Sequence, residues 1–225
     1  VPYRANILAL KSLGAHTVVA VNAVGSLDLD LAPGDLAVPE DLFDRTYGRP
    51  ATFFGPGLVA HVAFAQPLCA GVRRALVGAG GALPVNVHGG GVLAVVEGPR
   101  FSTRAESTSL RTAGFALVGM TTMPEAALAR EAEMCYASLC IVTDYDSWRA
   151  DAAEVTVDQV IETMHATVRH AEDLLRRALP ALAARTDCAC RHALADALTT
   201  APAAVDQALA RQLDVLVGRY LHPSP

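Results

Sequence analysis

The chain has 225 residues, of which 52% are hydrophobic, 5% aromatic and 18% charged, and its formal net charge is -5. This composition can bury a sizeable core in one large domain or two small ones, and the dispersed negative charge disfavours nucleic acid or an anionic membrane as a partner. No stretch reaches the ~18 uninterrupted apolar residues of a membrane span. No basic-then-apolar leader opens the sequence, so we expect no membrane association.

The cysteines indicate a reduced, cytoplasmic protein. There are five of them, Cys69, Cys135, Cys140, Cys188 and Cys190, and two lie inside apolar runs. An odd count of this kind does not suggest a disulfide framework. Cys188 and Cys190 are too close together for half of an ordinary zinc knuckle, and no second CxxC follows, so we predict no metal site.

The first part of the chain predicts a helix and then a strand. Residues 1–13 have apolar positions at helical spacing, and Gly14 ends that helix. Residues 17–21 are apolar and β-branched, as in a buried strand. The small residues 22–26 predict a turn whose backbone N–H groups suit an anion such as phosphate, although most turns of this kind bind nothing.

The middle of the chain predicts an alternation of strands and helices. We expect a short strand at 36–39, a polar loop at 41–61, a helix at 66–79 and one Val-rich strand at 86–96. Ser102 is the predicted N-cap of the following helix, with Glu106 near its first turn. A buried strand at 117–120 then ends at Thr121, and Pro124 begins another helix. A long amphipathic helix at 157–182 and a final helix at 203–220 complete the chain.

The stretch from Tyr136 to Trp148 predicts the central strand of the fold and the acidic residues that follow it. Its first seven residues are apolar except Ser138, which predicts a strand buried on both faces. Asp144 and Asp146 follow at the strand's C-terminal end, where open α/β sheets bind ligands. Two adjacent carboxylates repel each other, so we expect one to keep a proton that it could give to a nitrogen leaving group. The alternative is that both simply cap the next helix.

Strands that alternate with helices predict an α/β fold. We find no internal repeat and no low-complexity linker, so residues 1–225 are expected to form a single domain.

Five motifs occur in order along the chain: NAVGS (22–26), PGD (33–35), EGPRFSTRAES (97–107), MTTMPE (120–125) and TDYDSW (143–148). Together they resemble the trimeric purine nucleoside phosphorylase superfamily, and most closely its S-methyl-5'-thioadenosine phosphorylase branch, from Tyr3 to about Leu182. The later CACRHAL segment is similar to bacterial members. The resemblance implies a mixed, largely parallel twisted sheet flanked by helices, a homotrimer, and no cofactor besides inorganic phosphate as co-substrate.

The implied reaction is phosphorolysis in purine and methionine salvage. Phosphate attacks the anomeric carbon of S-methyl-5'-thioadenosine, and adenine and S-methyl-5-thio-ribose 1-phosphate are released. Such a reaction needs donors for the phosphate, for which backbone N–H and hydroxyl groups at strand ends are suited, and an acid that protonates the base at N7. Asp144 is the implied proton donor, and Asp146 would help to orient the base.

The resemblance also implies the remaining binding residues. Phosphate would be held by Asn22, Ala23 and Thr121, while the ribose and base would contact Met120, Phe101, Ser102 and Thr143. One face of the long helix, with Val157, Val160 and Ile161, would line an apolar slot for the methylthio group, and His61 would reach the slot of a neighbouring subunit. Ordinary core packing for the helix face, and a plain surface position for His61, are the alternatives.

The base preference follows from two positions. Relatives that prefer 6-oxopurines resemble this chain but carry Glu at the position of Ser102 and Asn at that of Asp144. Ser102 with Asp144 therefore favours adenine, because an aspartic acid can accept from the amino group and protonate N7. A 6-oxopurine nucleoside or methylthioinosine remains the alternative substrate.

Family members begin with a strand, a glycine-rich phosphate loop and an arginine-histidine segment. This chain starts at the helix to which those segments lead, so an N-terminally truncated member of the family is expected. A third alternative is therefore an inactive subunit that only binds nucleoside.

Overall fold

The computed structural model describes residues 1–149, 155–185 and 187–222. The strands are β1 (Thr17–Ser26), β2 (Leu36–Val38), β3 (Asp41–Arg45), β4 (Val87–Gly89), β5 (Val92–Val96), β6 (Leu117–Gly119) and β7 (Cys135–Asp144). The α-helices are α1 (Tyr3–Ser12), α2 (Ala70–Ala79), α3 (Arg104–Thr112), α4 (Thr122–Glu131), α5 (Val157–Ala183), α6 (Gln207–Gln212) and α7 (Asp214–Leu221).

The strands form one sheet in the order β3-β5-β6-β1-β7-β2-β4. Four neighbouring pairs are parallel, namely β1–β7, β2–β4, β3–β5 and β5–β6, whereas β1–β6 and β2–β7 are antiparallel. The predicted α/β fold with a mixed, largely parallel sheet is therefore confirmed.

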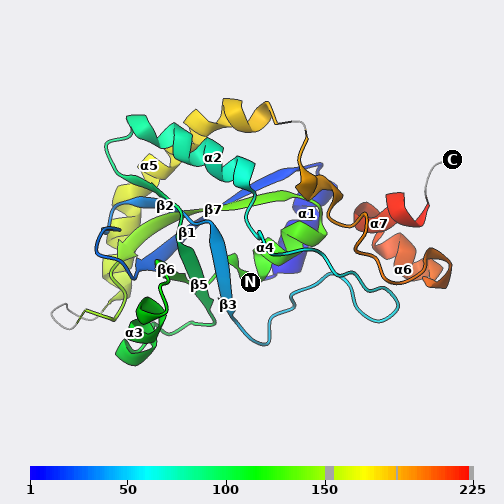
Figure 1. Cartoon of the computed structure of the whole chain (residues 1–225), viewed down its shortest axis with the longest axis horizontal. Helices are drawn as coiled ribbons and strands as arrows, with labels where there is room; N and C mark the ends of the chain where they lie inside the picture. Colours follow the sequence, from blue (N-terminus) through cyan, green and yellow to red (C-terminus); the bar gives the residue numbers. More distant parts are fainter. Residues whose placement is uncertain (150–154, 186, 223–225) are drawn as a thin grey trace.

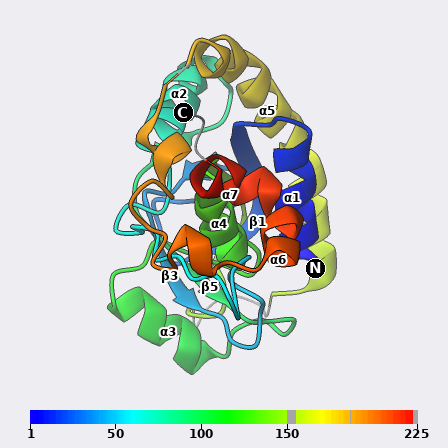
Figure 2. The same ribbon diagram turned by 90° about the vertical axis from the view of Figure 1, so that its right-hand side faces the viewer.

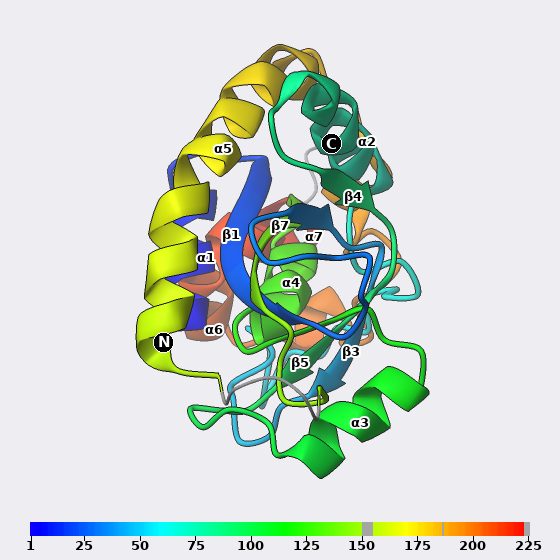
Figure 3. The same ribbon diagram turned by 90° about the vertical axis from the view of Figure 1, so that its left-hand side faces the viewer.

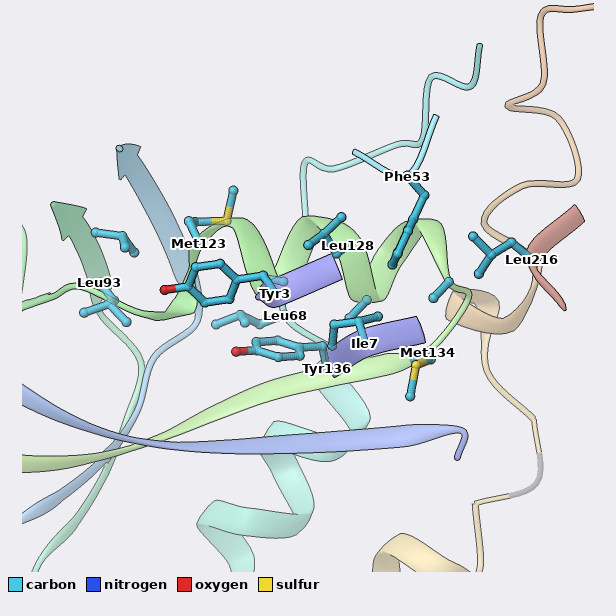
Figure 4. Close-up of a cluster of buried hydrophobic side chains, with 14 of the residues drawn as sticks. Tyr3, Ile7, Phe53, Leu68, Leu93, Met123, Leu128, Met134, Tyr136 and Leu216 are labelled. Carbon is cyan, nitrogen blue, oxygen red and sulfur yellow. The ribbon is translucent and has the colours of Figure 1, made fainter. Parts of the chain in front are cut away.

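Strand β7 lies near the middle of the sheet and is buried along its whole length. Its even-numbered side chains, such as Tyr136, pack toward α1 and α4, and its odd-numbered ones, such as Leu139, pack toward α2 and α5. Figure 1 shows these two helix pairs on opposite faces of the sheet. Figure 4 shows Tyr136 beside Ile7 of α1, in the cluster that also contains Leu128 of α4. A strand covered on both faces explains the nearly continuous apolar sequence.

Two connections cross the sheet, one from β2 to β3 and the other from β4 to β5. The chain bends between β4 and β5 at Gly90 and Gly91, whose φ angles of 112° and 76° are readily accessible to glycine. The prediction of one strand over 86–96 was therefore wrong, because the glycines divide it. The predicted loop at 41–61 was also partly wrong, because 41–45 form edge strand β3 beside β5. Figure 3 shows β3 and β5 near α3, away from β4.

The predicted turn at 22–26 is in fact the second half of β1. Asn22 and Ala23 pair with Cys140 and Ile141 of β7, and the register shifts only at Gly25. Small side chains next to a fully buried strand allowed β1 to continue through the motif. The backbone N–H groups there belong to an extended strand, so the prediction of an anion-binding turn was wrong in its local structure.

The helices were mostly predicted correctly, with three corrections, the first being that α2 begins at Ala70 and not at residue 66. Thr103, not Ser102, is the N-cap of α3: its hydroxyl accepts the N–H of Glu106, whose carboxylate accepts the N–H of Thr103. The predicted helix at 203–220 is divided into α6 and α7, and Asp206 caps α6. Figure 2 shows α7 beside α1. Among the described helices, none is long and apolar enough to cross a membrane.

Candidate active site

The two aspartates lie where β7 ends, and both are only 7% exposed. The backbone N–H of Asp146 donates to Oδ1 of Asp144 at 2.7 Å, and the hydroxyl of Thr143 lies 2.7 Å from Oδ2. Burial raises the pKa of Asp144 above its ordinary value of 3.8, and repulsion from Asp146 acts in the same direction. The two hydrogen bonds lower the pKa but do not cancel the rise.

The hydroxyl of Thr143 has a second acceptor, which limits how strongly it stabilises an ionised Asp144. The oxygen of Thr143 lies 3.2 Å from the carbonyl of Val24 as well as near the aspartate. A hydroxyl has one proton, so Thr143 cannot donate fully to both acceptors. If Asp144 carries the proton, it donates to Thr143, and Thr143 donates to Val24. In this arrangement the carboxyl group of Asp144, the hydroxyl of Thr143 and the carbonyl of Val24 each have a hydrogen-bond partner.

Asp146 retains unused binding capacity. Its backbone has φ = 49°, which is uncommon for a residue other than glycine. Its Oδ2 atom is buried and has no hydrogen-bond partner among the described residues. Buried polar atoms are normally paired, so an unpaired oxygen beside Asp144 marks a position where a ligand donor could bind.

A polar network connects β1 to the start of α4. The side-chain amide of Asn22 donates to Thr121 at 2.6 Å and to Thr122 at 3.2 Å, and Ser138 donates to its carbonyl oxygen at 2.7 Å. Asn22 is buried, Ala23 is half-buried and Thr121 is exposed. The structure thus brings together the three residues predicted to bind phosphate, with Thr121 open to solvent.

Two glycines allow close packing around these groups. A Cβ atom on Gly25 would lie 3.0 Å from Oδ1 of Asp144 and 3.1 Å from Cβ of Asp146. Gly98, at φ = 68°, would place a Cβ 2.5 Å from the sulfur of Met120. Neither glycine was predicted as a site residue, although both belong to quoted motifs. Their missing side chains let the aspartates approach β1 and let Met120 approach the segment that follows β5.

Arg49 is a further residue that the sequence did not indicate. Its guanidinium donates to the carbonyl oxygens of Met120, Met123 and Glu97 at 2.6–2.7 Å, and its Nε lies 3.1 Å from a carboxylate oxygen of Glu97. These bonds join the segments that follow β5 and β6. The arginine lies in an irregular segment, so only the tertiary fold reveals its role.

The base-binding candidates lie beside α3. Ser102 is half-buried and lines a pocket of about 530 Å³ with Arg45, Glu97 and Arg100. Phe101 is 36% exposed, so it is not a core residue. Asp144 and Asp146 are not among the described residues that line this pocket.

The methylthio candidates form an exposed apolar face at the start of α5. Val157 is 60% and Ile161 46% exposed, while Val160 is half-buried. Ordinary core packing therefore does not account for them within one chain. His61 is exposed at a different place, where its backbone N–H donates to Ala197 at 2.8 Å. The chain does not bring His61 into the network around the aspartates.

Comparison with known proteins agrees with this geometry. The phosphorylase superfamily profile matches residues 1–180. S-methyl-5'-thioadenosine phosphorylase of Chloroflexus aurantiacus is 46% identical over 221 residues, which span 98% of this chain and 77% of that protein. The enzyme of the same name from Cereibacter sphaeroides is 45% identical over 224 residues, with the same coverage.

Solved structures give the same result. A methylthioadenosine phosphorylase from an antarctic soil metagenomic library has a TM-score of 0.90 and 40% identity, and the match covers 96% of this chain and 77% of that one. The Schistosoma mansoni methylthioadenosine phosphorylase in complex with adenine has a TM-score of 0.78 and 38% identity, over 82% and 71% of the two chains. The chain therefore belongs to the phosphorylase superfamily, and within it to the S-methyl-5'-thioadenosine phosphorylase family.

Proposed function

We propose that this chain catalyses the phosphorolysis of S-methyl-5'-thioadenosine to adenine and S-methyl-5-thio-ribose 1-phosphate. The observation that carries the proposal is the buried Asp144 at the C-terminal end of β7, whose pKa is raised by burial although two hydrogen bonds to its carboxyl group act in the opposite direction. Relatives that are 45–46% identical over nearly the whole chain bear the name of this activity.

In the proposed mechanism, Asp144 donates its proton to N7 of the purine while the bond between base and sugar breaks. The departing base would otherwise carry negative charge, so protonation lowers the barrier. Asp146 supplies its unpaired Oδ2 as an acceptor for a donor on the base. The proton and electron pair both leave with adenine.

Phosphate is the proposed nucleophile. Thr121 donates its exposed hydroxyl, and Asn22 holds that hydroxyl in place through its side-chain amide at 2.6 Å. Ala23, next to Asn22 within β1, is the third proposed phosphate contact. Donors that are fixed before phosphate arrives cost little reorganisation during the reaction. The phosphate's oxygen attacks the anomeric carbon as the base departs.

We also propose a preference for 6-aminopurines and assembly as a homotrimer. The preference rests on Ser102 with Asp144. The assembly rests on the exposed apolar face of Val157 and Ile161, which a neighbouring subunit carrying His61 could cover. A cytoplasmic location, favoured by the odd number of cysteines, stays a prediction.

The test is to incubate the full chain with S-methyl-5'-thioadenosine and to measure adenine chromatographically with and without inorganic phosphate. We expect adenine and the sugar phosphate in equal amounts, and only when phosphate is present. No adenine, or release that ignores phosphate, would contradict the proposal. With methylthioinosine we expect kcat/KM lower by at least about 10²-fold, because a mismatched buried donor is costly. A faster 6-oxo substrate would reverse the base assignment.

A further inference from the structure

Four cysteines that are far apart in the sequence meet at the end of β7 opposite to Asp144. The Sγ atoms of Cys69, Cys135, Cys188 and Cys190 all lie within 4.8 Å of one another, and those of Cys69 and Cys188 are 3.7 Å apart. All are buried except Cys188, which is half-buried.

The sulfur spacing fits a metal better than a disulfide. A tetrahedral zinc ion with Zn–S bonds of about 2.3 Å separates its sulfurs by about 3.8 Å. A disulfide would need about 2.05 Å. The spacing of 3.7 Å between Cys69 and Cys188 is close to the first value, and the cysteines are free thiols. Tetrahedral sites with four sulfur ligands favour zinc or iron among the common metals.

We propose that Cys69, Cys135, Cys188 and Cys190 bind one zinc ion. In this step the four thiols lose four protons to solvent and form four Zn–S bonds, with no change of oxidation state. All four ligands come from the protein, which is typical of a structural zinc site rather than a catalytic one.

The site would join three parts of the fold. Cys69 precedes α2, Cys135 begins β7, and the last two ligands come from the segment that leads toward α6. Zinc would therefore attach the C-terminal segment to the sheet. The nine residue steps from Cys135 to Asp144 span about 30 Å at the rise of a strand, so the ion would not take part in the reaction.

The surroundings suit a negatively charged metal–thiolate centre. Nη2 of Arg185 lies 3.7 Å from Sγ of Cys69, and this guanidinium occupies the space that a side chain at Gly71 would need. Cys69 is also the N-cap of α2, where the helix dipole favours a thiolate. Three of the cysteines line a pocket of about 540 Å³, which gives an ion a route of entry.

The sequence did not indicate a metal site, because Cys188 and Cys190 are too close together for a zinc knuckle and no second CxxC motif is present. The fold adds Cys69 and Cys135 as separate ligands, and no CxxC motif is then required. Cys140 packs on the other face of β7, so it supplies a cysteine outside the cluster as a matched control.

The experiment measures metal content and thiol reactivity in the full chain, expressed with zinc available and purified without chelator. We expect one zinc per chain, and four thiols that react only after a strong chelator removes it. We expect Cys140→Ala to keep the zinc and Cys190→Ser to lose it. Cobalt(II) added to the metal-free protein should produce thiolate charge-transfer absorption and tetrahedral d–d bands.

If Cys190→Ser fails to fold, zinc binding can be tested with the wild-type protein alone. We then expect the chelator to lower the Tm, and added Zn²⁺ to restore it. A disulfide between any two of the four cysteines in anaerobically purified protein would overturn the proposal. So would a reduced protein that takes up neither Zn²⁺ nor Co²⁺.

Discussion

The two ends of β7 carry reactive side chains in different surroundings. At the C-terminal end, Asp144 has partners on both oxygens, but Asp146 keeps one oxygen without a partner among the described residues. At the N-terminal end, the thiol of Cys135 lies among three others and beneath a segment from the far end of the sequence. The C-terminal end of β7 is suited to bind and release a ligand, whereas the N-terminal end connects segments that are distant in the sequence.

We therefore expect substitutions at the two ends of β7 to have different effects, on the catalytic rate at one end and on the stability of the fold at the other. Substitutions at the aspartate end should change catalysis while the fold persists, because the groups there are aimed at a substrate. Substitutions at the cysteine end, or near it, should change stability while the chemistry persists.

The largest effect is expected for Asp144→Asn. An amide cannot supply the proton to N7, so we expect kcat/KM for S-methyl-5'-thioadenosine to fall by about 10²–10⁴-fold. Steady-state release of adenine measures the loss. Asp173→Asn on the exposed surface of α5 is the matched control and should retain activity. Equal rates in the wild type and Asp144→Asn would remove Asp144 from the mechanism.

Thr121→Val tests the phosphate contacts. Loss of one hydrogen bond to a charged ligand is worth about 1.5–3 kcal/mol, which corresponds to roughly 10–150-fold in the KM for phosphate. The KM for the nucleoside should change much less, since the hydroxyl does not face the base in the proposed mechanism. A change in both constants by the same factor would argue against a specific phosphate role.

A smaller effect, on stability alone, is expected for Arg219→Met. Glu133 is buried, and its carboxylate accepts Arg219 at 2.5 Å, the hydroxyl of Tyr220 at 2.6 Å and the N–H of Leu194 at 3.0 Å. Removing a half-exposed arginine should cost about 1–3 kcal/mol, because Glu133 then loses its cationic partner. Urea unfolding measures this free energy.

Arg177→Met on the exposed surface of α5 provides the control for that measurement. We expect it to change the free energy of unfolding by less than about 0.5 kcal/mol. Equal losses in the two variants would mean that Glu133 does not anchor the C-terminal segment. A loss of kcat in Arg219→Met would contradict the expectation that substitutions near the cysteine end leave catalysis unchanged.

Much of the fold could be predicted because its signals are local. The apolar run after Cys135 predicted a buried strand, and Pro124 predicted where the regular part of α4 begins. The turn prediction at 22–26 failed because small residues fit a strand packed against β7 as well as they fit a turn. Ser102 was chosen as a cap although the adjacent Thr103 has Glu106 three residues later.

The candidate site was predicted only where it follows one strand or one motif. Asp144 and Asp146 come directly after an apolar run, so their position at the end of a strand could be foreseen. Cys69 and Cys188 are 119 residues apart, and no local pattern indicates that they meet. Arg49 lies in an irregular segment, and its partners are set by the tertiary packing.

The raised pKa of Asp144 also makes the stability of the fold depend on pH. Because the folded pKa is higher than the ordinary value of 3.8, the native state holds this proton more tightly than the unfolded chain does. Its contribution to stability is therefore present below pH 3.8 and is lost as the pH rises through the folded pKa.

The most direct test of the account is the pH dependence of kcat in the wild type and in Asp144→Asn. The wild-type rate should decline as the pH rises through the raised pKa of Asp144, since only the protonated acid can donate to the base. The residual rate of Asp144→Asn should show no such decline, because an amide does not titrate. The same decline in both proteins would show that another group supplies the proton.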